Sequence, residues 1–89
     1  SLSLQTGEST QDVIDALNYS QNSPVVLKFD EAQKLFKGSK NKSAMERDLC
    51  AFIFPHGDFV KNRITGKIAG NEVTADFRNL ILILATNEK

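Results

Sequence analysis

The run Leu80–Ala85, LILILA, constrains the fold of this chain most strongly. A short, continuous apolar run bounded by polar residues is typical of a strand that is covered on both faces in a parallel sheet. A second run of this kind, Val25–Phe29 (VVLKF), follows Pro24. Helical sequence separates the two runs, so a right-handed βαβ crossover is the natural topology. The chain is therefore predicted to be α/β, with parallel strands over about 24–29 and 80–86.

Capping signals predict helices between and before these strands. Ser9 and Asp12 form an S-x-x-D start signal, and apolar residues follow at helical spacing, which predicts a helix over about 10–19. Ser43 and Glu46 form a capping box in front of another apolar stripe. That spacing predicts a helix that begins just after Ser43.

The remaining segments complete the expected element order. β-Branched residues on either side of the turn sequence AGNE predict a β-hairpin over about 63–76. A further helix is predicted to begin at Glu31 and to end near Gly38. The opening residues, SLSL, are interpreted as an earlier strand.

The bulk composition indicates a soluble globular chain and excludes some partners. The 89 residues are 40% apolar and 25% charged, and 11 basic residues balance 11 acidic ones. A net charge of zero argues against nucleic acid and anionic membrane as partners, and local basicity is confined to KGSKNK, residues 37–42. Cys50 is the single cysteine, which fits a reducing, cytoplasmic compartment. We expect no membrane span, because no apolar run is long enough.

Polar residues follow both apolar runs. Asp30 and Glu31 follow the first run, and Thr86 and Asn87 follow the second. Ligands of open parallel sheets bind beyond the carboxyl ends of the strands, so this edge is a candidate site. Nucleotide hydrolysis needs such a set: one carboxylate for Mg²⁺, a second to polarise water and an amide to orient it. Structural roles are the alternative, with the acids capping a following helix and the asparagine forming a turn.

Three segments in this order resemble a known family. VVLKFDE resembles the Walker B strand of AAA+ ATPases, and LILILATN resembles their sensor-1 strand. ITGKIAGNEVTADFRN resembles the hairpin that precedes sensor 1 in the Clp-like branch. The resemblance covers about residues 24–88. It implies that residues 1–89 are a single partial domain, the central part of an AAA+ nucleotide-binding module. The implied fold is a fragment of a P-loop NTPase-type parallel sheet with helices on its faces.

The resemblance also implies roles for individual residues. Asp30 would bind the cofactor by organising Mg²⁺ through water, and Thr86 would line the same nucleotide site. Glu31 would be the catalytic base and Asn87 the sensor-1 residue. The parent protein would bind ATP and Mg²⁺, form a homo-oligomeric ring and remodel or unfold protein substrates.

Some residues depart from the family pattern. The chain contains no P-loop: the TGKI segment has Lys61 where the first glycine would stand and no Ser or Thr after Lys67. The isolated chain is therefore expected to bind neither ATP nor Mg²⁺. Lys28 stands in a strand that the family keeps apolar. Arg78 is expected to pair with an acid such as Asp76 rather than with phosphate.

Two further expectations follow from these departures. The alternative function is a non-enzymatic interaction domain, either a degenerate AAA+-like module or an unrelated small α/β domain. A partial module this short would also expose sheet edges and apolar faces, so the chain is expected to self-associate or to be only marginally stable.

Overall fold

The computed structural model describes residues 2–5, 9–30, 32, 43–53 and 62–86. The chain is α/β, as the sequence predicts. In chain order its elements are β1 (Leu2–Gln5), α1 (Thr10–Tyr19), β2 (Val25–Phe29), α2 (Ala44–Ile53), β3 (Arg63–Ile68), β4 (Asn71–Asp76), the 3₁₀ turn η2 (Phe77–Asn79) and β5 (Leu80–Leu84).

The two apolar runs lie side by side in one parallel sheet. The sheet has three strands in the order β1-β2-β5, and both pairings are parallel. β2 and β5 are paired along their whole length, from Val25 opposite Leu80 to Phe29 opposite Leu84. The predicted strand in SLSL is confirmed as β1, which pairs with the other side of β2.

Both helices with described bounds begin at the predicted capping signals. The Ser9 hydroxyl accepts a hydrogen bond from the Asp12 backbone N–H at 3.2 Å, and α1 spans the predicted residues. Ser43 and Glu46 exchange two hydrogen bonds of 3.1 Å in a complete capping box. These contacts satisfy N–H groups that a helix end would otherwise leave unpaired. The helix predicted from Glu31 lies outside the described residues, apart from Ala32.

The predicted hairpin is confirmed as β3 and β4, which pair antiparallel from Arg63 opposite Asp76 to Ile68 opposite Asn71. Ala69 and Gly70 form its two-residue turn, with φ angles of 50° and 83°. Positive φ at both positions is the requirement of a type I′ turn, whose twist matches that of the paired strands.

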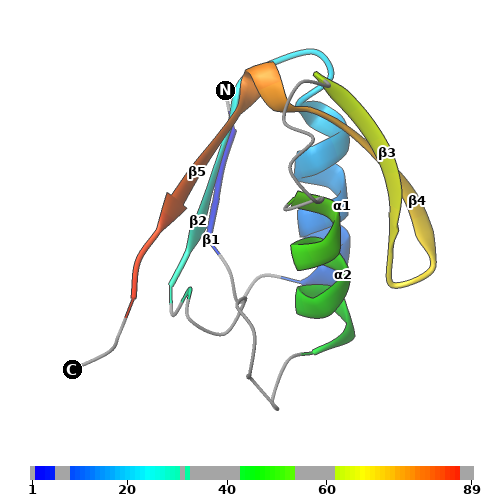
Figure 1. The fold of residues 1–89 in the computed structure, drawn as a ribbon. Coiled ribbons are helices and arrows are strands. Elements are labelled where there is room, and N and C mark those ends of the chain that lie inside the picture. Colours follow the sequence, from blue (N-terminus) through cyan, green and yellow to red (C-terminus); the bar gives the residue numbers. More distant parts are fainter. Residues whose placement is uncertain (1, 6–8, 31, 33–42, 54–61, 87–89) are drawn as a thin grey trace.

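The helices lie between the sheet and the hairpin (Figure 1). α1 packs against β1 and β2 on one side and against β4 on the other, while α2 packs against β3. The core between these layers is formed by buried apolar residues: Val13, Ile14, Leu17, Leu27, Phe29, Ala32, Leu49, Phe52, Ile68, Val73 and Ala75. Neither α1 nor α2, with 10 residues each, has the length and apolarity of a membrane span.

The two faces of the sheet differ in exposure. In β2 alternate residues are buried toward the helices, while Val26 and Lys28 are half-buried on the opposite face. On that face of β5, Ile81 and Ile83 are 54% and 45% exposed. α1 and α2 lie on the same side of the sheet (Figure 1). The helix expected from Glu31 lies outside the described residues, so the expectation of helices on both faces stays a prediction. Lys28 is tolerated in the strand because it projects from the face opposite α1 and α2.

Candidate functional site

The carboxyl ends of β2 and β5 are held together by backbone hydrogen bonds. The Ala85 N–H donates to the Phe29 carbonyl at 2.9 Å, and the Ala32 N–H donates to the Ala85 carbonyl at 2.8 Å. The pairing therefore continues past the last strand residues. It brings the polar residues that follow each strand to a common edge, where ligands of parallel sheets bind.

Asp30 and Thr86 are the predicted site residues that the structure describes at this edge. Both are exposed, with the Asp30 side chain 54% accessible. The Lys28 ammonium lies 4.0 Å from Asp30 Oδ1. An ion pair this exposed contributes little to stability, and the Asp30 side chain stays more than half accessible to solvent beside it. Glu31 and Asn87, the predicted base and sensor-1 residue, lie outside the described residues.

Asp30 is the described carboxylate at this edge that could hold Mg²⁺ together with a nucleotide. Mg²⁺ in nucleotide sites keeps several waters and takes one or two carboxylates plus substrate phosphates. Asp30 is a carboxylate of that kind. Within the described ranges, no three His, Cys, Asp or Glu residues come together as a metal-binding group. The water-mediated contact of Asp30 with Mg²⁺ stays a prediction.

A second polar cluster is built around Asp76, where the DFRN sequence begins. The Asp76 side chain is 2% exposed, and its carboxylate accepts hydrogen bonds from Arg78 Nη2 at 2.7 Å and from Arg78 Nε at 3.0 Å. The Arg78 backbone N–H also donates to it at 3.0 Å. Arg63 Nη2 lies 4.0 Å from Asp76 Oδ2. The expected pairing of Arg78 with Asp76 is confirmed, so Arg78 serves the fold at this junction.

Ser20 links this cluster to the end of α1. Its buried hydroxyl donates to the Leu17 carbonyl at 2.5 Å and accepts from the Asp76 backbone N–H at 2.9 Å. The Asn79 side chain donates to the Ser20 carbonyl at 2.8 Å. These hydrogen bonds connect Asp76 and Asn79, which precede β5, to the C-terminal end of α1. They thereby help to position the start of β5 relative to the helix. Sequence reasoning missed Ser20 and Asn79, because neither belongs to a local pattern that signals a contact 56 or 59 residues away.

The contacts with Arg78 lower the pKa of Asp76 to about 2. The side-chain hydrogen bond from Arg78 is the largest cause, and burial opposes it. The same pairing raises the pKa of Arg78. Because the pKa of an unperturbed aspartate is about 4, the Asp76 carboxylate stabilises the fold above that pH. This stabilisation is lost as the pH falls toward 2.

Asp76→Asn is therefore expected to flatten the acid side of the stability profile. At pH 6 the variant should unfold at a lower urea concentration than the wild-type chain, because a neutral amide binds Arg78 more weakly. The two urea midpoints should converge between about pH 4 and pH 2, as protonation removes the same charge from the wild type. Urea titrations at several pH values measure this difference. If the difference between the two urea midpoints stayed constant down to pH 2, the role assigned to Asp76 would be contradicted.

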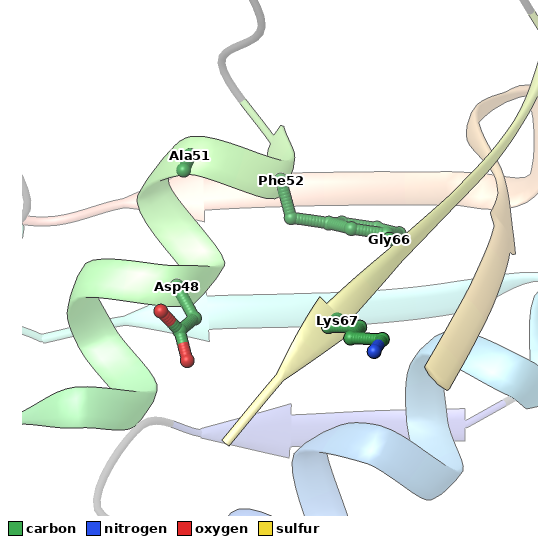
Figure 2. Close-up of a pocket in the computed structure, with 5 residues that line it drawn as sticks. All are labelled: Asp48, Ala51, Phe52, Gly66 and Lys67. Carbon is green, nitrogen blue, oxygen red and sulfur yellow. The ribbon is translucent and has the colours of Figure 1, made fainter. Parts of the chain in front are cut away.

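A small open pocket lies between α2 and β3 (Figure 2). Its volume is about 160 Å³, and its lining residues are Asp48, Ala51, Phe52, Gly66 and Lys67. Ligand pockets usually measure about 300–1,000 Å³. The Asp48 carboxylate also accepts the backbone N–H of Ala69 at 2.8 Å, which ties the hairpin turn to α2. The pocket is therefore read as a packing junction rather than as a ligand site.

Other residues considered from the sequence add no chemistry within the described ranges. Cys50 is half-buried on α2. His56 and the basic loop at residues 37–42 lie outside the described residues. Comparison with known protein families, with curated proteins and with solved structures finds no match to this chain. The edge shared by β2 and β5 is the candidate functional site, because the hydrogen bonds of Ala85 bring the polar residues after both strands together there.

Proposed function

We propose that this chain is the part of an AAA+ ATPase module that carries the Walker B and sensor-1 strands. The single observation that supports this most is the junction at Ala85, whose backbone groups bond to Phe29 and Ala32 at 2.9 and 2.8 Å. This junction puts Asp30 and Thr86 at one edge, as hydrolysis of a bound nucleotide requires. The parent protein would be a Clp-like chaperone, unfoldase or remodelling ATPase that acts as a homo-oligomeric ring on protein substrates.

The proposed roles follow from the chemistry of each side chain. When bound, Mg²⁺ and ATP supply the charge neutralisation and the phosphoryl group that is transferred. Asp30 would hold Mg²⁺ through water, and Thr86 would line the same nucleotide site. Glu31 accepts a proton from the attacking water, and the Asn87 amide orients that water. A P-loop from another part of the module must hold the nucleotide.

Glu31→Gln in the parent protein tests the base assignment. The variant should bind ATP but hydrolyse it at least about 100-fold more slowly, which is the usual scale for losing a catalytic base. ATP binding and steady-state turnover, measured separately, check this. Glu72→Gln, which makes the same change at an exposed position of β4, serves as the matched control and should hydrolyse ATP at the wild-type rate. Wild-type turnover in Glu31→Gln would refute the assignment.

The second candidate is a non-enzymatic interaction domain. The observation that favours it is the Lys28 ammonium 4.0 Å from Asp30 Oδ1, because a resident cation beside the carboxylate disfavours a metal ion there. In that case partner binding would be independent of nucleotide and would survive the double substitution Asp30→Ala with Glu31→Ala. Loss of binding in this variant would exclude the second candidate.

A further inference from the structure

β5 is an edge strand without the usual protection of an edge. Among the described strands it pairs with β2 alone, so no described strand pairs with the backbone groups on its other side. All five of its residues are apolar, with no proline and no charge. Natural edge strands usually carry lysine, proline or a bulge, which prevent pairing with another chain. This edge is therefore suited to accept a further strand.

The hydrogen bonds at Ala85 show which backbone groups of β5 face outward. Both the N–H and the carbonyl of Ala85 are directed at the β2 side, where they bond to Ala32 and Phe29. Because these groups alternate in direction along a strand, those of Ile81 and Ile83 also face β2. The backbone groups of Leu82 and Leu84 and the Leu80 carbonyl then face this edge, while the Leu80 N–H donates to the Phe77 carbonyl.

A second copy of β5 can pair with these groups along the whole strand. In an antiparallel pair centred on Leu82, each Leu82 lies opposite the other, and each Leu80 lies opposite Leu84. The Leu82 pair would exchange two hydrogen bonds, and each Leu80–Leu84 pair one, from the Leu84 N–H to the Leu80 carbonyl, because the Leu80 N–H already donates to Phe77. Ile81 then lies opposite Ile83 on the sheet face away from α1 and α2, in the pairs where side chains come closest. Every opposed pair is apolar, so no charge resists the pairing.

Other described strands fit this edge less well. β2 already has a neighbour on each side, and each of β1, β3 and β4 includes polar residues. α1 makes its sheet contacts with β1 and β2, so it lies away from the β5 edge (Figure 1). Leu84 is 42% exposed, which is consistent with an edge that the helices do not cover.

We propose that two copies of this chain associate through β5, antiparallel about Leu82, so that their two sheets become one continuous sheet. The interface is isologous, since each copy contributes the same strand to it. The proposal concerns the 89-residue chain itself and does not rest on ATP hydrolysis. It names β5 as the interface through which the expected self-association occurs.

Charged substitutions on β5 test the pairing. Ile81→Lys with Ile83→Lys places like charges directly opposite one another, and should raise the dimer dissociation constant at least about 10-fold. Mixing this variant with the Ile81→Glu, Ile83→Glu variant should restore a 1:1 dimer, because opposite charges then face each other. Analytical ultracentrifugation measures both results. Tyr19→Lys, at an apolar position of α1 that is 44% exposed, should dimerise like the wild type.

A cross-linking variant keeps the test decisive if the charged variants fold poorly. With Cys50→Ser to remove the native thiol, Leu82→Cys should give a disulfide-linked dimer in oxidised glutathione, because opposed residues lie within disulfide reach. Tyr19→Cys in the same background should stay largely monomeric. A wild-type chain that remains monomeric, a charge mixture that forms no 1:1 dimer, or equal cross-linking of the two cysteine variants would each overturn the proposal.

Discussion

Replacing Phe52 with alanine is expected to lower the free energy of unfolding by about 3–5 kcal/mol, the range for a buried phenylalanine. Phe52 is 5% exposed and belongs to the core shared by the helices, the sheet and the hairpin. Its ring also packs edge-on against Phe77, with centroids 6.2 Å apart and an interplanar angle of 75°. The truncation removes this contact and leaves a cavity at the junction of α2 with β3 and η2.

Urea unfolding at one fixed protein concentration measures the effect, because association would otherwise add to apparent stability. A loss of this size approaches the total stability of a small domain, about 5 kcal/mol at the lower end. The Phe52→Ala chain is therefore expected to be partly unfolded at 37 °C. Tyr19→Ala removes an aromatic ring from a 44% exposed position and should cost much less. Equal costs for the two variants would contradict the placement of Phe52 in the core.

Gly66→Ala is expected to lower the free energy of unfolding by about 1–3 kcal/mol, the usual cost of overpacking. A Cβ at position 66 would lie 2.6 Å from Phe52 Cδ2 and 3.0 Å from Phe52 Cε2. The close approach of this ring to the β3 backbone is visible in Figure 2. In an unobstructed strand the same change would be favourable, because alanine loses less conformational entropy than glycine on folding.

A double-mutant cycle isolates this steric cause. Phe52→Val removes the ring atoms that a new Cβ would meet, so Gly66→Ala should cost nothing, or be slightly stabilising, in that background. Coupling between residues in contact commonly reaches 0.5–3 kcal/mol, which urea unfolding resolves. Gly70→Ala is the contrasting control: there the cost comes from a φ of 83°, with no atom within 4 Å of the new Cβ, and should not depend on Phe52. Equal costs of Gly66→Ala in both backgrounds would refute the steric explanation.

The glycine of TGKI shows how a motif-like fragment can serve packing. In sequence, Gly66 and Lys67 look like the end of a phosphate-binding loop, although the rest of that motif is missing. In the structure they lie on β3, where the absent side chain of Gly66 makes room for Phe52. The DFRN sequence also has a structural role. Asp76 and Arg78 form hydrogen bonds with each other, and Asp76 and Asn79 form hydrogen bonds with Ser20.

The sequence predicted part of the candidate site as well. Asp30 and Thr86 were expected at one sheet edge because each follows an apolar run, and the bonds of Ala85 hold those ends together. The roles of Glu31 and Asn87 in ATP hydrolysis stay predictions. Lys28 could be recognised as unusual from the sequence, but only its half-buried position opposite the helices explains why the strand tolerates it.

Local chemistry by itself determined the elements of this protein. The caps at Ser9 and Ser43, the positive φ angles at Ala69 and Gly70, and the two apolar runs involve residues near one another in the chain, so their patterns are readable in order. Tertiary structure alone decided which face of the sheet the helices cover, and that Ser20 fastens the start of β5. These outcomes depend on contacts between distant segments, whose free energies arise from packing geometry that no local pattern encodes.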